Sequence, residues 1–253
     1  MFIAGESIML EKPQKILLTG GTSGIGLELL RQLNQKGHSM IVLGRDADKL
    51  AQLRRNFVDV ETYCCDLAQK HELESVLNEI RTTHPTISIL INNAAVQNTP
   101  AFTAPDFDYD TLTSEVDINF LAPVRLTYLL LDGFLKQTRP SAIVNISSGL
   151  ALYPKTSSSI YCATKAALHS FSQSLRYQLY EHPVRVIEVL LPLVNTPMTA
   201  GRGRKKLSAS AAATHILLGI SGSKDEIYIG RARWLPLLIR VCPGIAKSLL
   251  RRA

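Results

Sequence analysis

The sequence predicts a single α/β domain built on a doubly wound parallel sheet of about seven strands, with helices on both faces. Short apolar or β-branched runs alternate with longer segments of helical periodicity from Lys15 to about residue 191. Apolar strands that alternate with helices imply parallel strands joined by right-handed crossovers. The chain has 253 residues, of which 46% are hydrophobic, and this is enough for a sizeable core.

The alternation can be followed element by element. Strands are expected at KILLTG (15–20), SMIVLG (39–44), VETYCC (60–65), ISILIN (87–92), AIVNISS (142–148) and VRVIEVLL (184–191). Helices are expected at 25–36, 46–56, 69–82, within 107–137 and at 158–181. No repeat or long linker divides the chain. We therefore expect a flexible lead over 1–14, one domain over 15–233 and a tail over 234–253, with either Met1 or Met9 as the true start.

The formal charge of +7 is concentrated in the last fifth of the chain. From Arg202 onward there are 11 Lys and Arg against 2 acidic residues, and the rest of the chain carries 17 against 19. A nucleic-acid-binding body is therefore not expected. The tail is basic and amphipathic, and Pro236 and Pro243 imply that a helix there is broken or begins near Pro243. It is expected to lie on an anionic membrane, over the substrate pocket or against a neighbouring subunit.

Cysteine usage and the N-terminus indicate a reducing, cytoplasmic compartment. The four cysteines lack metal-ligand spacing and do not resemble a disulfide framework. The N-terminus lacks a secretory pattern, and no apolar run reaches the ~18–20 residues needed to cross a bilayer. We expect neither a metal site nor a membrane span.

A glycine-rich turn follows the first strand and directly precedes a helical pattern. It reads TGGTSGIG from Thr19 to Gly26. Such glycines permit a tight turn, close approach of a pyrophosphate and close packing of helix on strand. An ordinary strand–helix turn is the alternative interpretation. The residues expected to hold the cofactor phosphates are Gly20, Thr22, Ser23, Gly24, Ile25 and Gly26.

Arg45 follows the second strand, where NAD-preferring proteins of this fold usually carry an acidic residue. A planar guanidinium suits the charge and geometry of a 2′-phosphate. Arg45 therefore favours NADP(H) over NAD(H). The alternative is a solvated arginine that pairs locally with Asp46 or Asp48.

Tyr161 and Lys165 form a YxxxK pair, and Ser148 precedes the tyrosine by thirteen residues. Residues four apart share a helical face, so both side chains can enter one crevice. A phenol with a pKa of ~10 needs a nearby ammonium to lower that pKa before it can serve as an acid–base group. Ser148, at a strand end, can hold the substrate oxygen. Each feature alone also has a purely structural interpretation.

In combination these motifs resemble the short-chain dehydrogenase/reductase family. The form TGxxxGxG, the NNAA run at 92–95, Asn119 in DINF, Ser148 and the Tyr161/Lys165 pair occur in the family's order between residue 15 and about residue 200. The resemblance implies a Rossmann-type fold and an NADP(H)-dependent oxidoreductase. It would transfer a hydride between the nicotinamide and a carbonyl or secondary alcohol, with Tyr161 as general acid/base.

The resemblance also assigns roles to residues that spacing alone does not. Asn119 is implied as a fourth catalytic residue that anchors a water in a proton relay through Lys165. Further cofactor contacts are implied for Asp66, Leu67, Asn92, Ala94, Tyr161, Lys165, Leu191, Val194 and Thr196. A homodimer or homotetramer is also implied. TPMT (196–199) and KDEIYIGRARWLPLL (224–238) more weakly resemble a branch of oxidoreductases named for D-alanine transfer to cell-wall polymers.

Two positions depart from the family's pattern. Ala95 replaces the glycine of NNAG, and Leu191-Pro192 stands where the family has Pro-Gly. Ala95 implies slightly different packing beneath the nicotinamide ribose. Leu191-Pro192 puts in doubt how tightly the loop after the sixth strand grips the nicotinamide and whether its geometry admits the family's usual substrates. A substrate loop is expected at about 197–215, and its basic residues are either solvated or receive an anionic, carrier-linked carbonyl substrate. The competing functions are a weakly catalytic NADP(H)-binding regulator and a membrane-associated protein that uses the basic tail.

Overall fold

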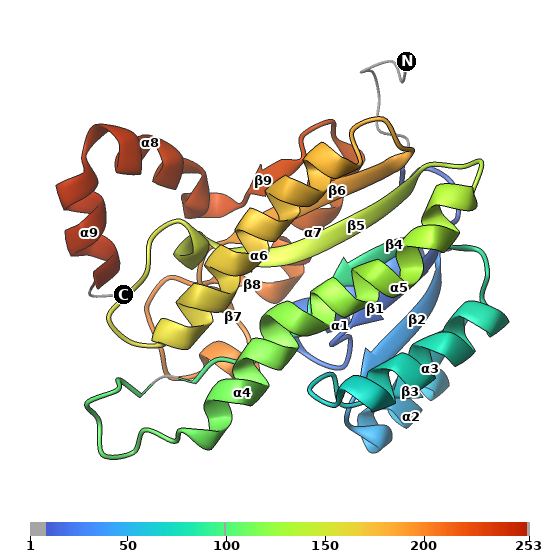
Figure 1. The fold of residues 1–253 in the computed structure, drawn as a ribbon, viewed down its shortest axis with the longest axis horizontal. Coiled ribbons are helices and arrows are strands. Elements are labelled where there is room, and N and C mark those ends of the chain that lie inside the picture. Colours follow the sequence, from blue (N-terminus) through green and yellow to red (C-terminus); the bar gives the residue numbers. More distant parts are fainter. Residues whose placement is uncertain (1–8, 99, 252–253) are drawn as a thin grey trace.

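A parallel sheet of seven strands runs through the centre of the structure in the order β3-β2-β1-β4-β5-β6-β9 (Figure 1). The computed structural model describes residues 9–98 and 100–251. Because all pairings are parallel, the carboxyl ends of the strands share one edge, and the order reverses between β1 and β4. The strands are β1 (Lys15–Thr19), β2 (Ser39–Gly44), β3 (Val60–Cys64), β4 (Ile87–Asn92), β5 (Ser141–Ser148), β6 (Val184–Leu191) and β9 (Glu226–Tyr228); β7 (Val194–Asn195) and β8 (Leu207–Ser208) form a separate parallel pair.

Helices cover both faces of this sheet, because the strands are apolar on both sides. One face packs against leucines and isoleucines of α1, α2 and α7, and the other against those of α3, α5 and α6. The helices are α1 (Gly24–Gln35), α2 (Ala47–Asn56), α3 (Lys70–Thr83), α4 (Asp110–Val116), α5 (Ala122–Lys136), α6 (Ser159–Gln178), α7 (Ala209–Ser221), α8 (Leu235–Val241) and α9 (Pro243–Arg251). The doubly wound architecture predicted from the sequence is confirmed.

The predicted boundaries agree with the structure to within a few residues up to β6, and the differences lie at the two ends of the chain. The expected loop at 197–215 ends near residue 207, because Ser208 caps α7 by accepting a hydrogen bond from the Ala211 amide at 3.1 Å. The expectation of a loose lead does not hold for Met9 and Leu10, which are buried in the core. Residues 1–8 of that lead lie outside the described residues.

The stretch Asp110–Lys136 is a continuous helical segment with a change of pitch. A π-helical turn at Asp117–Leu121 joins α4 to α5. By length and composition it is the one helix in the described part of the chain that could cross a membrane, a weak indication that core helices also satisfy. Here α5 packs on the sheet through Leu126, Leu130 and Phe134, which are almost fully buried. The segment therefore serves as a core helix.

The two C-terminal helices extend beyond the β9 edge of the sheet as a V-shaped pair (Figure 1). The break falls at Cys242–Pro243, as the prolines in this segment predicted. Leu235, at the start of α8, packs directly on Gly149. The approach is so close that a Cβ built on that glycine would lie 2.5 Å from the leucine side chain. The tail therefore meets the domain next to Ser148.

Candidate active site

The glycine turn after β1 has the backbone shape that a phosphate cradle requires. Gly20 and Gly24 have φ values of +69° and +54°, a region that side chains disfavour. A Cβ on Gly26 would lie 2.1 Å from the Gly20 carbonyl oxygen, so strand and helix meet with no room for a side chain. Ser23 precedes α1 without capping it through its side chain. The first amides of α1 are therefore left for an anion.

Thr22 and Ile25 complete this turn, and both are partly buried. Two further residues hold the turn in place, and the sequence analysis did not single them out. The Thr19 hydroxyl accepts hydrogen bonds from the amides of Asn93 and Ala94 at 3.0 Å each. The side-chain amide nitrogen of Asn93 donates to the backbone carbonyls of Thr19 at 3.0 Å and Gly20 at 3.1 Å. Their signal was their position, immediately before the first glycine and within NNAA.

Arg45 stands exposed at the end of β2 beside this turn. The adjacent Gly44 approaches Thr22 closely, with 3.5 Å between a Cβ built on the glycine and the threonine methyl. Asp46 is engaged elsewhere: it accepts from the Lys49 amide at 3.0 Å and pairs with the Lys49 ammonium at 2.8 Å. In the described part of the chain, no carboxylate forms an ion pair with Arg45. Its guanidinium is free to meet a phosphate.

The remaining predicted cofactor residues lie along the same edge of the sheet. Ala94 lies against Gly20, and Thr196 lies against Gly24, with 2.9 Å and 3.1 Å between built Cβ positions and the nearest atoms. Leu191 ends β6, and Val194 is buried in β7. Asp66 and Leu67 follow β3, where the aspartate carboxylate accepts from the Ala68 amide at 3.0 Å.

Asn92 is the exception among them. Its side chain turns into the interior and donates to Asn145 at 2.8 Å. Any contact between Asn92 and a cofactor would therefore come from its backbone.

Ser148, Tyr161 and Lys165 converge at the end of β5. The Lys165 ammonium lies 5.7 Å from the centre of the Tyr161 ring and donates to the Ile146 carbonyl at 2.9 Å. The Ser148 hydroxyl accepts from the Leu150 amide at 3.1 Å and also hydrogen-bonds to Tyr161. The structure therefore brings the predicted trio together.

The protonation states of the trio are set mainly by burial. Burial raises the pKa of Tyr161 to about 12, although the hydrogen bond to Ser148 opposes the rise. This direction is the reverse of the one predicted from a nearby ammonium, because desolvation of the phenolate outweighs the favourable interactions. Burial also lowers the pKa of Lys165 to about 8, and the charge of Glu188 opposes that fall. Tyr161 is thus a neutral phenol at pH 7 and holds the proton that a reduction step would need.

Asn119 sits in the π-helical turn and is fully buried. Its side chain accepts from the Val96 amide and donates to the Val96 carbonyl, both at 2.8 Å, and donates to the Thr164 hydroxyl at 3.3 Å. Bonding to backbone was the structural alternative for this residue, and its side chain does bond in that way. Through Thr164 it also ties the segment after β4 to the residue before Lys165. Its part in a water relay stays a prediction.

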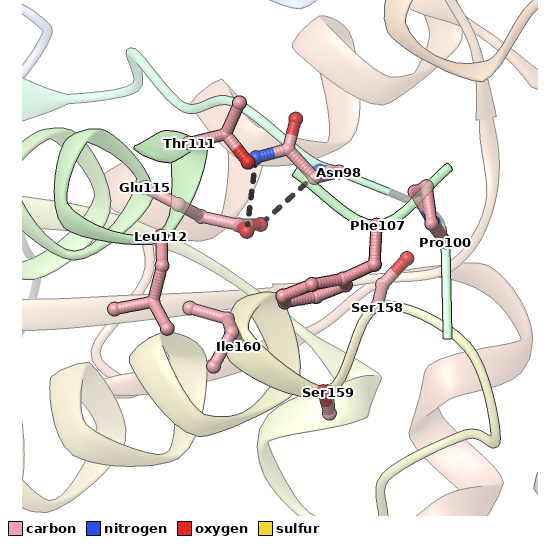
Figure 2. Close-up of a pocket in the computed structure, with 9 residues that line it drawn as sticks. All are labelled: Asn98, Pro100, Phe107, Thr111, Leu112, Glu115, Ser158, Ser159 and Ile160. Atoms are coloured by element: carbon pink, nitrogen blue, oxygen red, sulfur yellow. Dashed lines mark hydrogen bonds between the residues drawn. The ribbon is translucent and has the colours of Figure 1, made fainter. Parts of the chain in front are cut away.

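A recess beside Tyr161 contains an acidic residue that the sequence analysis missed. Figure 2 shows Glu115 in it, with the Asn98 side chain donating to the carboxylate at 3.4 Å. Glu115 is 1% exposed, and burial raises its pKa while bonds from Asn98 oppose the rise. Its signal was its position four residues before Asn119, on the same helical face. The recess is lined by Asn98, Pro100, Phe107, Thr111, Leu112, Glu115, Ser158, Ser159 and Ile160.

The loop after β6 crosses to the other side of the site. Arg202 donates to the Gln97 side chain at 2.8 Å, which links this loop to the segment after β4. The charge of Arg202 also favours the ionised form of Tyr161. The pKa of Lys155 is lowered mainly by burial and further by the charge of Arg202. Arg202 therefore lies near Tyr161, and Lys155 lies near Arg202.

This geometry defines an oxidoreductase of the dinucleotide-binding class, and comparison with known proteins agrees. A sequence profile described as short chain dehydrogenase matches residues 14–207. The chain belongs to the short-chain dehydrogenase/reductase family.

Individual relatives narrow the comparison. The chain is 35% identical over 218 residues, 84% of its length and 86% of the relative's, to the uncharacterized oxidoreductase DltE of Bacillus subtilis. It is 27% identical over 247 residues to a fatty acyl-CoA reductase of Acinetobacter baylyi, covering 94% and 83% of the two chains. A short-chain dehydrogenase of Sphingobium yanoikuyae, solved with NADPH, has a TM-score of 0.78 at 28% identity, covering 93% and 94%. The weaker resemblance to the branch named for D-alanine transfer is confirmed.

The glycine turn yields the first test. Gly26→Ala should weaken NADPH binding roughly ten-fold or more, because the new Cβ would collide with the Gly20 carbonyl and force the turn apart. NADPH fluorescence measures this affinity. Gly133→Ala is the matched control, since nothing lies within 4 Å of its built Cβ. Equal affinity in wild type and the Gly26 variant would mean that the turn does not hold the cofactor.

Proposed function

We propose that the protein is an NADP(H)-dependent reductase or dehydrogenase that acts on a carbonyl or secondary alcohol through Tyr161. The observation that carries this proposal is the convergence of the Tyr161 phenol, the Ser148 hydroxyl and the Lys165 ammonium at the ligand-binding edge of the sheet. The glycine turn and Arg45 fit an NADP(H) molecule in this crevice. When bound, the nicotinamide supplies or accepts the hydride.

The protein's own residues would handle the oxygen and the proton. In the direction of reduction, Ser148 and Tyr161 hold the carbonyl oxygen, and the neutral phenol donates its proton as negative charge develops there. The Lys165 ammonium beneath the ring stabilises the phenolate that results. Because the pKa of Lys165 is about 8, that cation is lost as the pH rises above this value. Reduction should therefore be favoured at neutral and mildly acidic pH.

We propose that the carbonyl is carried by an anionic group. Arg202 lies near Tyr161, and Lys155 lies near Arg202, so these two cations would attract such a group. The relative named as a fatty acyl-CoA reductase, which aligns with 94% of this chain, supports an acyl thioester as one such substrate. The exposed Arg204 and Lys205 extend the positive surface outward.

Tyr161→Phe tests the chemistry. With NADPH and a panel of ketones, aldehydes and 3-ketoacyl thioesters, turnover should fall by roughly 10²–10⁴-fold, because the proton donor is lost. Absorbance of the reduced cofactor follows the reaction, and NADPH fluorescence should show that the variant still binds the cofactor. Tyr177→Phe is the matched control, since that tyrosine lies on the same helix and is 79% exposed. Bound NADPH with no turnover of any substrate by the wild type would favour the regulator instead.

Arg45→Asp tests the cofactor preference. The variant should raise KM for NADPH by about ten- to a hundred-fold, because it replaces a charge-assisted partner of the 2′-phosphate by a like charge. KM for NADH should change far less. Arg55→Asp, on α2, alters the net charge equally and should leave both values near those of the wild type. A wild-type preference for NADH would refute the role of Arg45.

We propose as a second function that the tail docks on an anionic membrane surface. Trp234, Leu237 and Val241 are each more than half exposed and follow one another at helical spacing up to the end of α8, and Ile245 is more than half exposed on α9. From residue 227 to the end the chain has six Lys and Arg and no acidic residue. Such a surface attracts anionic lipids, whereas pairing it with a second copy would set like charges against each other. Docking there would bring apolar substrates close to Gly149, on which Leu235 packs, and so to the neighbouring Ser148.

The single tryptophan, Trp234, reports on this interaction directly. Its emission should shift to the blue with phosphatidylglycerol vesicles and stay unchanged with phosphatidylcholine vesicles. Leu237→Ser combined with Val241→Ser should weaken binding by at least about ten-fold, because burial of two large side chains is lost. Tyr128→Ser, at a 77% exposed site on α5, is the control. A shift that depends on protein concentration without lipid would indicate a subunit interface instead.

A further inference from the structure

A row of polar side chains crosses the sheet beneath the candidate active site. Asn92, Asn145, Glu188 and Glu226 are partners in register on β4, β5, β6 and β9, so they share one face of the sheet. The first three are at most 3% exposed, and Glu188 is completely buried. Polar groups are costly in such an interior unless they are paired, so the row calls for an explanation.

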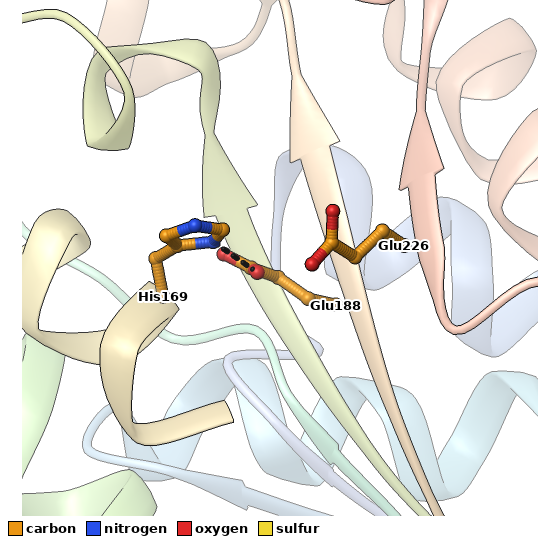
Figure 3. A group of neighbouring side chains, drawn as sticks. All are labelled: His169, Glu188 and Glu226. Atoms are coloured by element: carbon orange, nitrogen blue, oxygen red, sulfur yellow. Dashed lines mark hydrogen bonds and ion pairs between the residues drawn. The ribbon is translucent and has the colours of Figure 1, made fainter. Parts of the chain in front are cut away.

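Helix α6 supplies the partners of this row. His169 Nδ1 lies 2.6 Å from a Glu188 carboxylate oxygen, as Figure 3 shows. Arg176 lies 3.9 Å from the same oxygen and 3.1 Å from Glu226. Asn145 donates to Ser172 at 2.9 Å. One face of α6 is therefore devoted to the polar row.

Lys165 belongs to that same face, one turn before His169. Its ammonium is 3% exposed and donates to the carbonyl of Ile146, the neighbour of Asn145 on β5. Burial opposes its charged form, and Glu188 is the charged group that counteracts this by raising the pKa of Lys165. The titratable or charged groups that face Glu188 are Lys165, His169 and Arg176 on α6 and Glu226 and Tyr228 on β9.

We propose that Glu188 is a positioning residue for Lys165: its buried carboxylate, held by His169 and Arg176, keeps the lysine ammonium protonated beneath Tyr161. This inference rests on the proposed function, in which Lys165 supports proton donation by Tyr161. It gives the buried Glu188 charge a function beyond its ion pairs with His169 and Arg176. The carboxylate acts through Lys165 and needs no contact with substrate or cofactor.

A metal ion is the competing occupant of this cluster. Ligand atoms of His169, Glu188 and Glu226 lie within 4.8 Å of one another. However, Arg176 already pairs with both carboxylates, and a second cation would be repelled. The hydrogen bond that His169 donates to Glu188 also raises the pKa of His169, which favours the imidazolium, whereas a metal needs the neutral ring. The internal ion pairs are therefore the better account.

Glu188→Gln tests the proposal, because it keeps the shape of the side chain and removes its charge. NMR of isotope-labelled lysine, with Lys165→Arg to assign the signal, should show Lys165 losing its proton about one pH unit lower than in the wild type. The alkaline fall in the reduction rate should move to lower pH by the same amount, because reduction needs the ammonium. Glu188→Asp retains the charge and should restore both values toward those of the wild type.

Glu226→Gln is the matched control within the same row. It also removes a carboxylate that pairs with Arg176, but β9 lies one strand farther than β6 from the Ile146 carbonyl that Lys165 contacts. An unchanged Lys165 titration in Glu188→Gln, or an equal shift in Glu226→Gln, would overturn the proposal. So would Zn²⁺ raising the melting temperature of the wild type but not of the Glu188 variant, since that would identify a metal site.

The NMR titration separates this proposal from the proposed function. If Lys165 titrates at lower pH in Glu188→Gln but the wild type turns over no substrate, the Glu188–Lys165 coupling stands and the proposed enzymatic function is contradicted. If Glu188→Gln does not fold, combining it with Arg176→Gln removes both members of the ion pair. The Lys165 pKa should then fall in the same direction but by less, because a neighbouring cation is lost with the carboxylate. Turnover with an unmoved Lys165 titration in that double variant would contradict the positioning role alone.

Discussion

The rest of this site depends on the contact between the buried Lys165 ammonium and the Tyr161 ring above it. Removing Lys165 from solvent costs free energy in its charged form, and the fall of its pKa to about 8 reflects that cost. The surroundings offset part of it. The Ile146 carbonyl accepts its hydrogen bond, and the Glu188 charge lies on the adjacent strand. Tyr161 keeps its proton because the same burial disfavours the phenolate.

The cofactor half of the site depends on close backbone approach. Three segments that are distant in sequence meet at the glycine turn: the end of β4 through Ala94, the loop after β6 through Thr196, and α1 itself. Thr19 and Asn93 bind these segments together through hydrogen bonds to backbone. Hydride transfer depends on orientation, so a rigid cradle on the sheet edge is what this chemistry requires.

Departures from the family's pattern leave this frame intact. The Leu191-Pro192 pair still ends β6 and leads to Thr196 against Gly24, so the loop keeps its contact with the turn. The substrate side carries this chain's own features: Glu115 in a recess, Arg202 bridging to Gln97, and Leu235 of the tail on Gly149. One set of residues should therefore determine which substrate binds, and a separate set should perform the proton and hydride transfer.

The sequence by itself determined the sheet, its helices, the glycine turn and the Ser148, Tyr161 and Lys165 trio, because these follow from local periodicity and short spacings. It could not reveal that Asn92, Asn145, Glu188 and Glu226 form one row, because strand register joins residues that are far apart in the chain. Nor could it show that burial raises the pKa of Tyr161, since burial is a property of the packed fold. Glu115, Thr19 and Asn93 were missed for the same reason: only tertiary structure decided which of many similar polar residues are enclosed at the site.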